Sequence, residues 1–229
     1  MSKITWDGVG ERVWEAGVDR GVLYRQDETK KYTKGVAWNG LINVTEKPEG
    51  AEITKLWADN QNYANLMSAE VFKGGIEAYT YPAEFNECEG QAEVVPGARL
   101  GQQARVPFGM CYRSMVGDDT SPEPNAYKLH LIWNAMVSPT EKSHNTINEN
   151  PDAETFNWDF DTTPVPVTGY KPAASMEIDS RTLAKDKLTA IEAILYGSDE
   201  EEPRLPMPDE LITLMKAAAS NTGEEQTGE

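Results

Sequence analysis

Two carboxylates at strand spacing stand beside a tryptophan in TFNWDFDT, residues 155–162. On an extended strand, Asp159 and Asp161 project from the same face with their Cα atoms roughly 6.6–7 Å apart. This spacing is compatible with the carboxyl pair of a glycosidase, whose members lie about 5–9.5 Å apart. A general acid, however, needs a pKa raised by an apolar pocket or a nearby like charge. Both aspartates share a face with Asn157, and Trp158 points the other way. We therefore expect a solvated strand face rather than a catalytic pair.

The other residues that could do chemistry form no recognisable site. His130 lies within an apolar run and is expected to be structural, and His144 lies in a polar loop and is expected to be solvated. No G-x-S-x-G stretch occurs and no Ser–His pairing is indicated. Neither GxGxxG nor a P-loop is present to hold a nucleotide phosphate. The acidic stretches at 117–119 and 199–202 lack the pattern of a calcium loop. We therefore predict that the protein is not an enzyme and uses no metal or cofactor.

The composition excludes several further classes of function. The 229 residues include 21 Lys or Arg and 38 Asp or Glu, so the net charge is −17. This acidity argues against nucleic-acid binding by phosphate neutralisation, which needs clustered basic residues. Cys88 and Cys111 lack metal-site spacing and are expected to be reduced, structural thiols. No signal segment and no run of roughly 20 apolar residues is present, so we expect maturation in a cytoplasm and no membrane.

Residues 36–180 carry the signals of short strands separated by turns. The longest strand candidate is 127–137, with its alternate residues Tyr127 to Val137 on one face. Residues 62–68 are expected to pair with the run after Gly74-Gly75, and 91–103 to form an exposed connection. We predict a mainly β fold, with a β-sandwich or β-barrel-like core of about seven or eight short strands.

The two ends of the chain differ from this core. Residues 1–35 are predicted to form an N-terminal arm that docks onto its own domain or a neighbour, because they carry several large apolar groups. Residues 181–219 are predicted to be a helical segment packed on the core, with one helix over 179–197 and a second opening at Pro208. Residues 220–229 are predicted to be a disordered acidic tail.

Seven runs, in order, resemble the major tail tube proteins of long-tailed, siphovirus-like bacteriophages. They are GVDRGVLY, GVAWNGLINVTE, AYTYPAEF, YKLHLIWNAMVSPTEKS, TPVPVTGYKP, TLAKDKLTAIEAILYG and RLPMPDELITLM, and they span roughly residues 17–215. The resemblance implies a β-sandwich or β-barrel-like core carrying a helix, whose copies form hexameric rings that stack around a tape-measure protein. It also implies tail terminator and tail-tip proteins as partners, assembly in the host cytoplasm, and a place in the virion tail. It favours a non-contractile tail.

A tube of this kind would pass DNA without binding it specifically, because an acidic wall repels phosphate. The candidates for the acidic lining of the channel are Glu52, Glu77, Asp159 and Asp161. The candidates for anchors between the arm and a neighbouring subunit are Trp6, Trp14, Leu23 and Tyr24. Residues 117–126 or 139–152 could bridge successive rings.

Two other hypotheses stay open at this point. The first is a monomeric β-sandwich module that binds carbohydrate or protein through exposed aromatic rings, with Trp38 or Trp57 as candidates, although we expect both to be buried. The second is a hydrolase built on Asp159 and Asp161. A persistent monomer with saturable ligand binding would favour the module, and ring formation would count against it.

Overall fold

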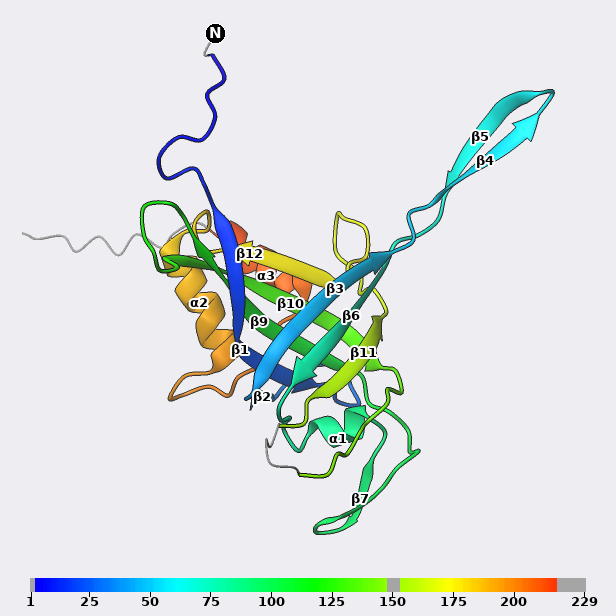
Figure 1. The fold of residues 1–229 in the computed structure, drawn as a ribbon, viewed down its shortest axis with the longest axis vertical. Coiled ribbons are helices and arrows are strands. Elements are labelled where there is room, and N and C mark those ends of the chain that lie inside the picture. The colour runs from blue at the N-terminus through cyan, green and yellow to red at the C-terminus, as the bar shows by residue number, and fades with distance from the viewer. Residues whose placement is uncertain (1–2, 148–152, 218–229) are drawn as a thin grey trace, which may run out of the picture.

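The computed structural model describes residues 3–147 and 153–217 (Figure 1). The mainly β fold is confirmed: the described residues form one large antiparallel sheet, two separate two-stranded sheets and three helices. The strands are β1 (Trp14–Arg25), β2 (Gly35–Trp38), β3 (Leu41–Glu49), β4 (Ile53–Ala58), β5 (Gln61–Met67), β6 (Val71–Ala78), β7 (Ala92–Val95), β8 (Ala98–Leu100), β9 (Phe108–Gly117), β10 (Ala126–Val137), β11 (Phe156–Thr162) and β12 (Ser175–Asp179). The helices are α1 (Phe85–Cys88), α2 (Lys185–Tyr196) and α3 (Pro208–Lys216). The predicted tail at 220–229 lies outside the described residues.

The large sheet curls back on itself. Its strands follow the order β2-β1-β9-β10-β11-β6-β3, and β12 pairs with the first half of β10. Strands β3, β6 and β11 cross in front of β9 and β10 in Figure 1. Although β1 and β3 are distant in this order, a Cβ added to Gly21 of β1 would lie 3.0 Å from Leu41 Cδ2 of β3. The sheet is therefore a barrel-like sandwich with an incompletely closed seam between β1 and β3.

Buried side chains form two clusters on opposite faces of the central strands. The cluster inside the curl is rich in aromatic rings and includes Trp38, Phe85, Phe108, Trp158 and Phe160. The second cluster joins the central strands to the two C-terminal helices and includes Tyr24, Trp133, Leu188, Ile191 and Leu211. Because α2 and α3 cover one face of the sheet, they belong to the hydrophobic core of the domain.

The structure corrects the predicted N-terminal arm. The strand β1 begins at Trp14 and pairs with both β2 and β9, so only the residues before it extend from the body. Leu23 and Tyr24, proposed as anchors to a neighbour, are 1% and 0% exposed within their own chain. The Tyr24 hydroxyl donates to the carbonyl oxygen of Leu195 at 2.6 Å. Consecutive apolar residues in GVLY indicate a strand buried on both faces rather than a docking segment.

A bulge changes the expected face of β10. Its register with β9 shifts between Ile132 and Ala135, and Asn134 has a left-handed φ of 52°. Asparagine adopts this conformation more readily than most residues, and the extra residue reverses the alternation beyond it. As a result Trp133 faces the helices, whereas Ala135 and Val137 join the aromatic cluster inside the curl.

Other elements differ from the predictions in pairing or length. Strand β5 pairs with β4 rather than with the run after Gly74-Gly75, and both glycines lie within β6. The connection predicted over 91–103 is exposed, and residues 92–100 within it form the β7–β8 hairpin. Helix α2 begins at Lys185 rather than near Asp179, because Asp179 ends β12. It closes at Gly197, as predicted, where φ is 82°.

Candidate functional site

The β4–β5 hairpin projects from the body and carries apolar side chains on both faces. It forms a sheet of its own, and Figure 1 shows it standing away from the barrel beyond the ends of β3 and β6. Its turn residues Asp59 and Asn60 have φ of 48° and 61°, the pattern of a type I′ turn. The exposed apolar side chains are Ile53, Leu56, Trp57, Tyr63, Leu66 and Met67.

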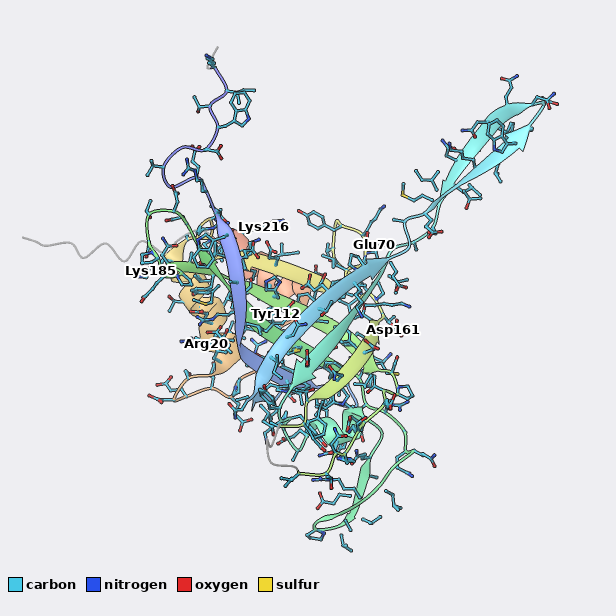
Figure 2. All side chains as sticks on the ribbon, in the orientation of Figure 1. Arg20, Glu70, Tyr112, Asp161, Lys185 and Lys216 are labelled. Atoms are coloured by element: carbon cyan, nitrogen blue, oxygen red, sulfur yellow. The ribbon has the colours of Figure 1, made fainter. Side chains whose placement is uncertain are left out.

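Such a hairpin is unusual for an isolated chain. A two-stranded hairpin has marginal stability alone in water, and exposed apolar patches of this kind mark interaction sites. Trp57 is 68% exposed and Tyr63 is 77% exposed, so the expectation that Trp57 is buried is wrong. Trp38, in contrast, is buried as expected. In Figure 2 the hairpin side chains stand clear of the body, beyond the root marked by Glu70.

Two smaller projections also expose apolar groups. Trp6, in the segment before β1, is 77% exposed, and the β7–β8 hairpin exposes Val94, Val95 and Leu100. The N-terminal segment is held to its own chain, since the Gly10 amide donates to Asp119 Oδ1 at 2.8 Å. Trp14 also lies against its own chain, where its ring fills the space beside Gly117.

Residues 117–126 and 139–152 are the two segments predicted to bridge successive rings. The loop after β9 is folded tightly, because the Asp118 carboxylate accepts hydrogen bonds from Thr120 and Asn125. Residues 148–152 of the second predicted segment lie outside the described residues. The projection of the β4–β5 hairpin was not predicted from the sequence, and its strands are longer than those of the β7–β8 hairpin. Its only local signal is the Asp59-Asn60 turn between two alternating runs.

Three of the four predicted lining residues share one polar face. Asp159 and Asp161 of β11 lie on the outer side of the curl, and β6 places Glu77 opposite Asn157 on that side. Glu52 is not part of this face. It lies at the foot of the β4–β5 hairpin, where its amide donates to Ser68 Oγ at 3.1 Å.

Lysines alternate with the carboxylates on this face. Lys47 of β3 lies 3.7 Å from Asp159, and Lys73 of β6 lies 3.2 Å from Asp161 and 3.1 Å from Glu49. The Lys73 ammonium donates hydrogen bonds to Glu49 and Asp161, and these bonds raise the pKa of Lys73. The side chains of Asp159 and Asp161 are 65% and 53% exposed. These surroundings do not provide the apolar pocket that a general acid requires.

A second polar cluster lies at the seam between β1 and β3. Ser114 Oγ lies 2.8 Å from His130 Nε2, and His130 Nδ1 lies 3.3 Å from Glu46 Oε1. The Tyr112 hydroxyl donates to the same Glu46 oxygen at 2.6 Å and its ring stacks on the imidazole, with centroids 4.7 Å apart. No motif in the sequence indicates this Ser–His contact, because Ser114 and His130 meet only through the pairing of β9 with β10.

This Ser–His–Glu arrangement resembles a nucleophilic triad in connectivity only. Ser114 lies within the large sheet, opposite Lys128 of β10 and opposite Val18 of β1, next to a register shift between Ala16 and Val18. The backbone groups around it therefore serve the sheet, whereas a nucleophilic site needs free N–H donors for an oxyanion. The cluster instead joins β3 to β9 and β10 across the seam, and its residues support the structural role predicted for His130.

The seam cluster predicts a specific pH dependence of stability. The hydrogen bond from His130, followed by that from Tyr112, lowers the pKa of Glu46. A lowered folded-state pKa stabilises the fold above the unfolded pKa of about 4.3, and this contribution is lost as the pH falls through the folded value. We expect Glu46→Gln to be less stable than wild type at pH 7, and the difference to shrink between about pH 5 and pH 3. Urea unfolding at pH values from 7 down to 3 measures the difference in the free energy of unfolding between wild type and Glu46→Gln. Glu77→Gln, from the exposed face, controls for the lost charge, and a constant difference would contradict the assignment.

The cysteines and the remaining histidine lie outside these surfaces. Cys88 and Cys111 are free and buried, and burial raises the pKa of each thiol to about 12. His144 is exposed and lies 2.9 Å from Glu154. Within residues 3–147 and 153–217, no helix is long and apolar enough to cross a membrane. The same residues contain no group of three or more His, Cys, Asp or Glu side chains arranged to hold a metal ion.

Neither a protein-family model nor a curated protein sequence matches the chain. Among solved structures, it is similar to the PVC sheath/tube terminator of an extracellular contractile injection system in the extended state. The identity is 10%, the TM-score is 0.35, and the match covers 72% of this chain and 97% of the other. It is also similar to a chain of the PVC sheath–tube complex of such a system, with 11% identity, a TM-score of 0.32, and coverage of 70% and 88% respectively.

Proposed function

We propose that the protein is a structural subunit of a phage tail tube, in which hexameric rings stack into a hollow cylinder. The observation that carries this proposal is the β4–β5 hairpin, whose apolar side chains are exposed on both faces. Contact with a second copy of the chain would bury these side chains and stabilise the hairpin. The ordered runs that resemble major tail tube proteins support the same assignment.

The edges of the large sheet support a ring. The strand order ends at β2 on one side and β3 on the other, and the first part of β3 faces β1 of its own chain across the seam. Exposed strand edges are templates for pairing with another chain, and a closed ring uses them without leaving a free end. Ring closure through these edges and ring stacking through the hairpin would use different surfaces of the subunit.

The polar face of β3, β6 and β11 is proposed as the lining of the channel. Glu77, Asp159 and Asp161 are interspersed there with Lys47 and Lys73. Such a wall carries few free cations to hold phosphate, so DNA could pass without being retained. On this proposal the tape-measure protein occupies the channel during assembly in the host cytoplasm. Terminator and tail-tip proteins then cap the two ends of the tube in the virion.

The proposal predicts that assembly depends on the hairpin. Trp57→Ser/Tyr63→Ser removes two exposed rings without touching the core, so we expect the variant to keep the wild-type thermal midpoint. We also expect wild type to form large assemblies as its concentration rises and the variant to stay monomeric, as measured by sedimentation velocity. Tyr79→Ser removes a ring that is 55% exposed on the body and should assemble like wild type. Equal assembly of all three proteins would contradict the role of the hairpin.

A further inference from the structure

A lysine side chain of this protein occupies an aromatic cage. The ammonium nitrogen of Lys142 lies over three rings, at 5.4 Å from the centroid of Tyr81, 5.8 Å from Phe156 and 5.9 Å from Trp158. Phe156 and Trp158 stack with an interplanar angle of 21°, and Tyr81 stands nearly perpendicular to both, at 85° and 81°. The three rings thus form walls around one cation, and aromatic faces attract cations at these distances.

A buried carboxylate completes the cage. The side chain of Glu89 is only 7% exposed, and its two oxygens lie 2.7 and 2.9 Å from Lys142 Nζ. The Trp158 indole N–H also donates to Glu89, and the Gln91 amide donates at 3.1 Å. Burying a carboxylate is costly unless it is paired and hydrogen-bonded, so the site is built to hold a positive charge.

The cage and its occupant come from different parts of the fold. Tyr81 and Glu89 flank α1, and Phe156 and Trp158 belong to β11, so all four stand on the packed body. Lys142 comes instead from the connection between β10 and β11, and its side chain is 28% exposed. A cavity of about 230 Å³ adjoins the site and is lined by residues that include Glu89, Gln91, Arg105, Thr140, Lys142 and Trp158. The cage is therefore preformed, and solvent reaches the cation.

We propose that this ammonium cage, formed by Tyr81, Phe156, Trp158 and Glu89, is a binding site for an alkylammonium group, and that Lys142 fills it in the isolated chain. An incoming cation would replace Lys142 in an exchange that conserves the charge of the site. Because Glu89 accepts hydrogen bonds from the ammonium nitrogen, the preferred ligand keeps at least one N–H. This favours a primary, monomethyl or dimethyl amine, such as a lysine side chain, over a quaternary ammonium. The proposal is independent of tube assembly.

The test measures the binding of small ammonium ions to a variant in which the cage is empty. n-Butylammonium chloride is titrated into monomeric Lys142→Ala while the indole N–H signals are followed by NMR, with the Trp158 signal assigned by its loss in Trp158→Phe. We expect a saturable shift of this signal, with a midpoint at least tenfold lower than in wild type, where Lys142 competes. Tetramethylammonium should bind more weakly, because it has no N–H for Glu89. Sodium chloride should give no saturable shift.

Matched variants separate the cage from general surface charge. Adding Glu89→Gln to Lys142→Ala should abolish the saturable shift, whereas adding Glu141→Gln, which removes an exposed carboxylate from the same connection, should leave it intact. If Lys142→Ala does not fold, Lys142→Gln replaces it under the same criteria. The proposal is overturned if the emptied cage shows no saturable shift, or if wild type and variant give the same midpoint.

Discussion

Replacing Trp133 by alanine is expected to lower the free energy of unfolding by about 3–5 kcal/mol, the range for deleting a large buried aromatic side chain. Trp133 is fully buried in the cluster between the central strands and the C-terminal helices. Its indole N–H donates to the carbonyl oxygen of Pro206 at 3.0 Å, just before α3 begins. The substitution therefore leaves a cavity and also an unpaired carbonyl group beneath the helix.

Urea unfolding followed by far-UV circular dichroism measures this effect, at a concentration low enough to keep the protein monomeric, since association shifts apparent stability. Met136→Ala is the control on the same strand, because Met136 is 44% exposed, and we expect a change within about 0.5 kcal/mol. A loss below about 1 kcal/mol for Trp133→Ala would show that α2 and α3 do not share a cooperative core with the sheet.

Gly74 and Gly75, which are adjacent in β6, are expected to respond very differently to replacement by alanine. A Cβ added to Gly74 would lie 2.5 Å from the carbonyl oxygen of Thr45 and closer still to the Phe160 ring. Neither neighbour can yield easily, because one is backbone of β3 and the other is packed in the core. We expect Gly74→Ala to destabilise the fold by about 1–3 kcal/mol or more, as overpacking does.

Gly75→Ala provides the comparison. Its added Cβ would point to the outer face, 3.3 Å from Asp159 Oδ1, which belongs to a solvent-exposed side chain. We expect a change within about 0.5 kcal/mol, which is usual for surface positions. The thermal unfolding midpoints of Gly74→Ala and Gly75→Ala, measured side by side, test this expected difference in stability. Similar midpoints for both would mean that β3 and β11 do not flank β6 as closely as the register requires.

Local patterns allowed much of this fold to be predicted. The alternation of Phe156, Trp158 and Phe160 predicted a strand with one buried face, and β11 has that pattern of burial. Pro208 marked the start of α3, and Asp59-Asn60 marked a turn, because both signals act within a few residues. Features of this kind depend on backbone preferences near the residue itself.

Features that depend on distant neighbours were not predictable in the same way. Because β1 is buried on both faces it lacks a period-2 signal, and its sequence predicts an arm where the structure places Leu23 and Tyr24 in the core. The Asn134 bulge reversed the faces of β10, which no alternation pattern reveals.

The seam cluster and the ammonium cage could not be predicted either, because their residues lie far apart in the sequence. The seam cluster joins Glu46 to His130 across the curled sheet, and the ammonium cage joins Lys142 to Glu89 through tertiary packing. Only the folded chain brings these residues together.

The exposed β4–β5 hairpin supports self-assembly into a tube. Negative-stain electron microscopy of the purified protein across a concentration series tests this self-assembly most directly. We predict hollow tubes or stacked six-fold rings with a central channel at high concentration, promoted by salts such as ammonium sulfate that strengthen apolar burial. Light scattering on the same samples should show mass rising with concentration. A uniform monomer at every concentration, with and without the salt, would contradict the account and favour a monomeric β-sandwich binding module.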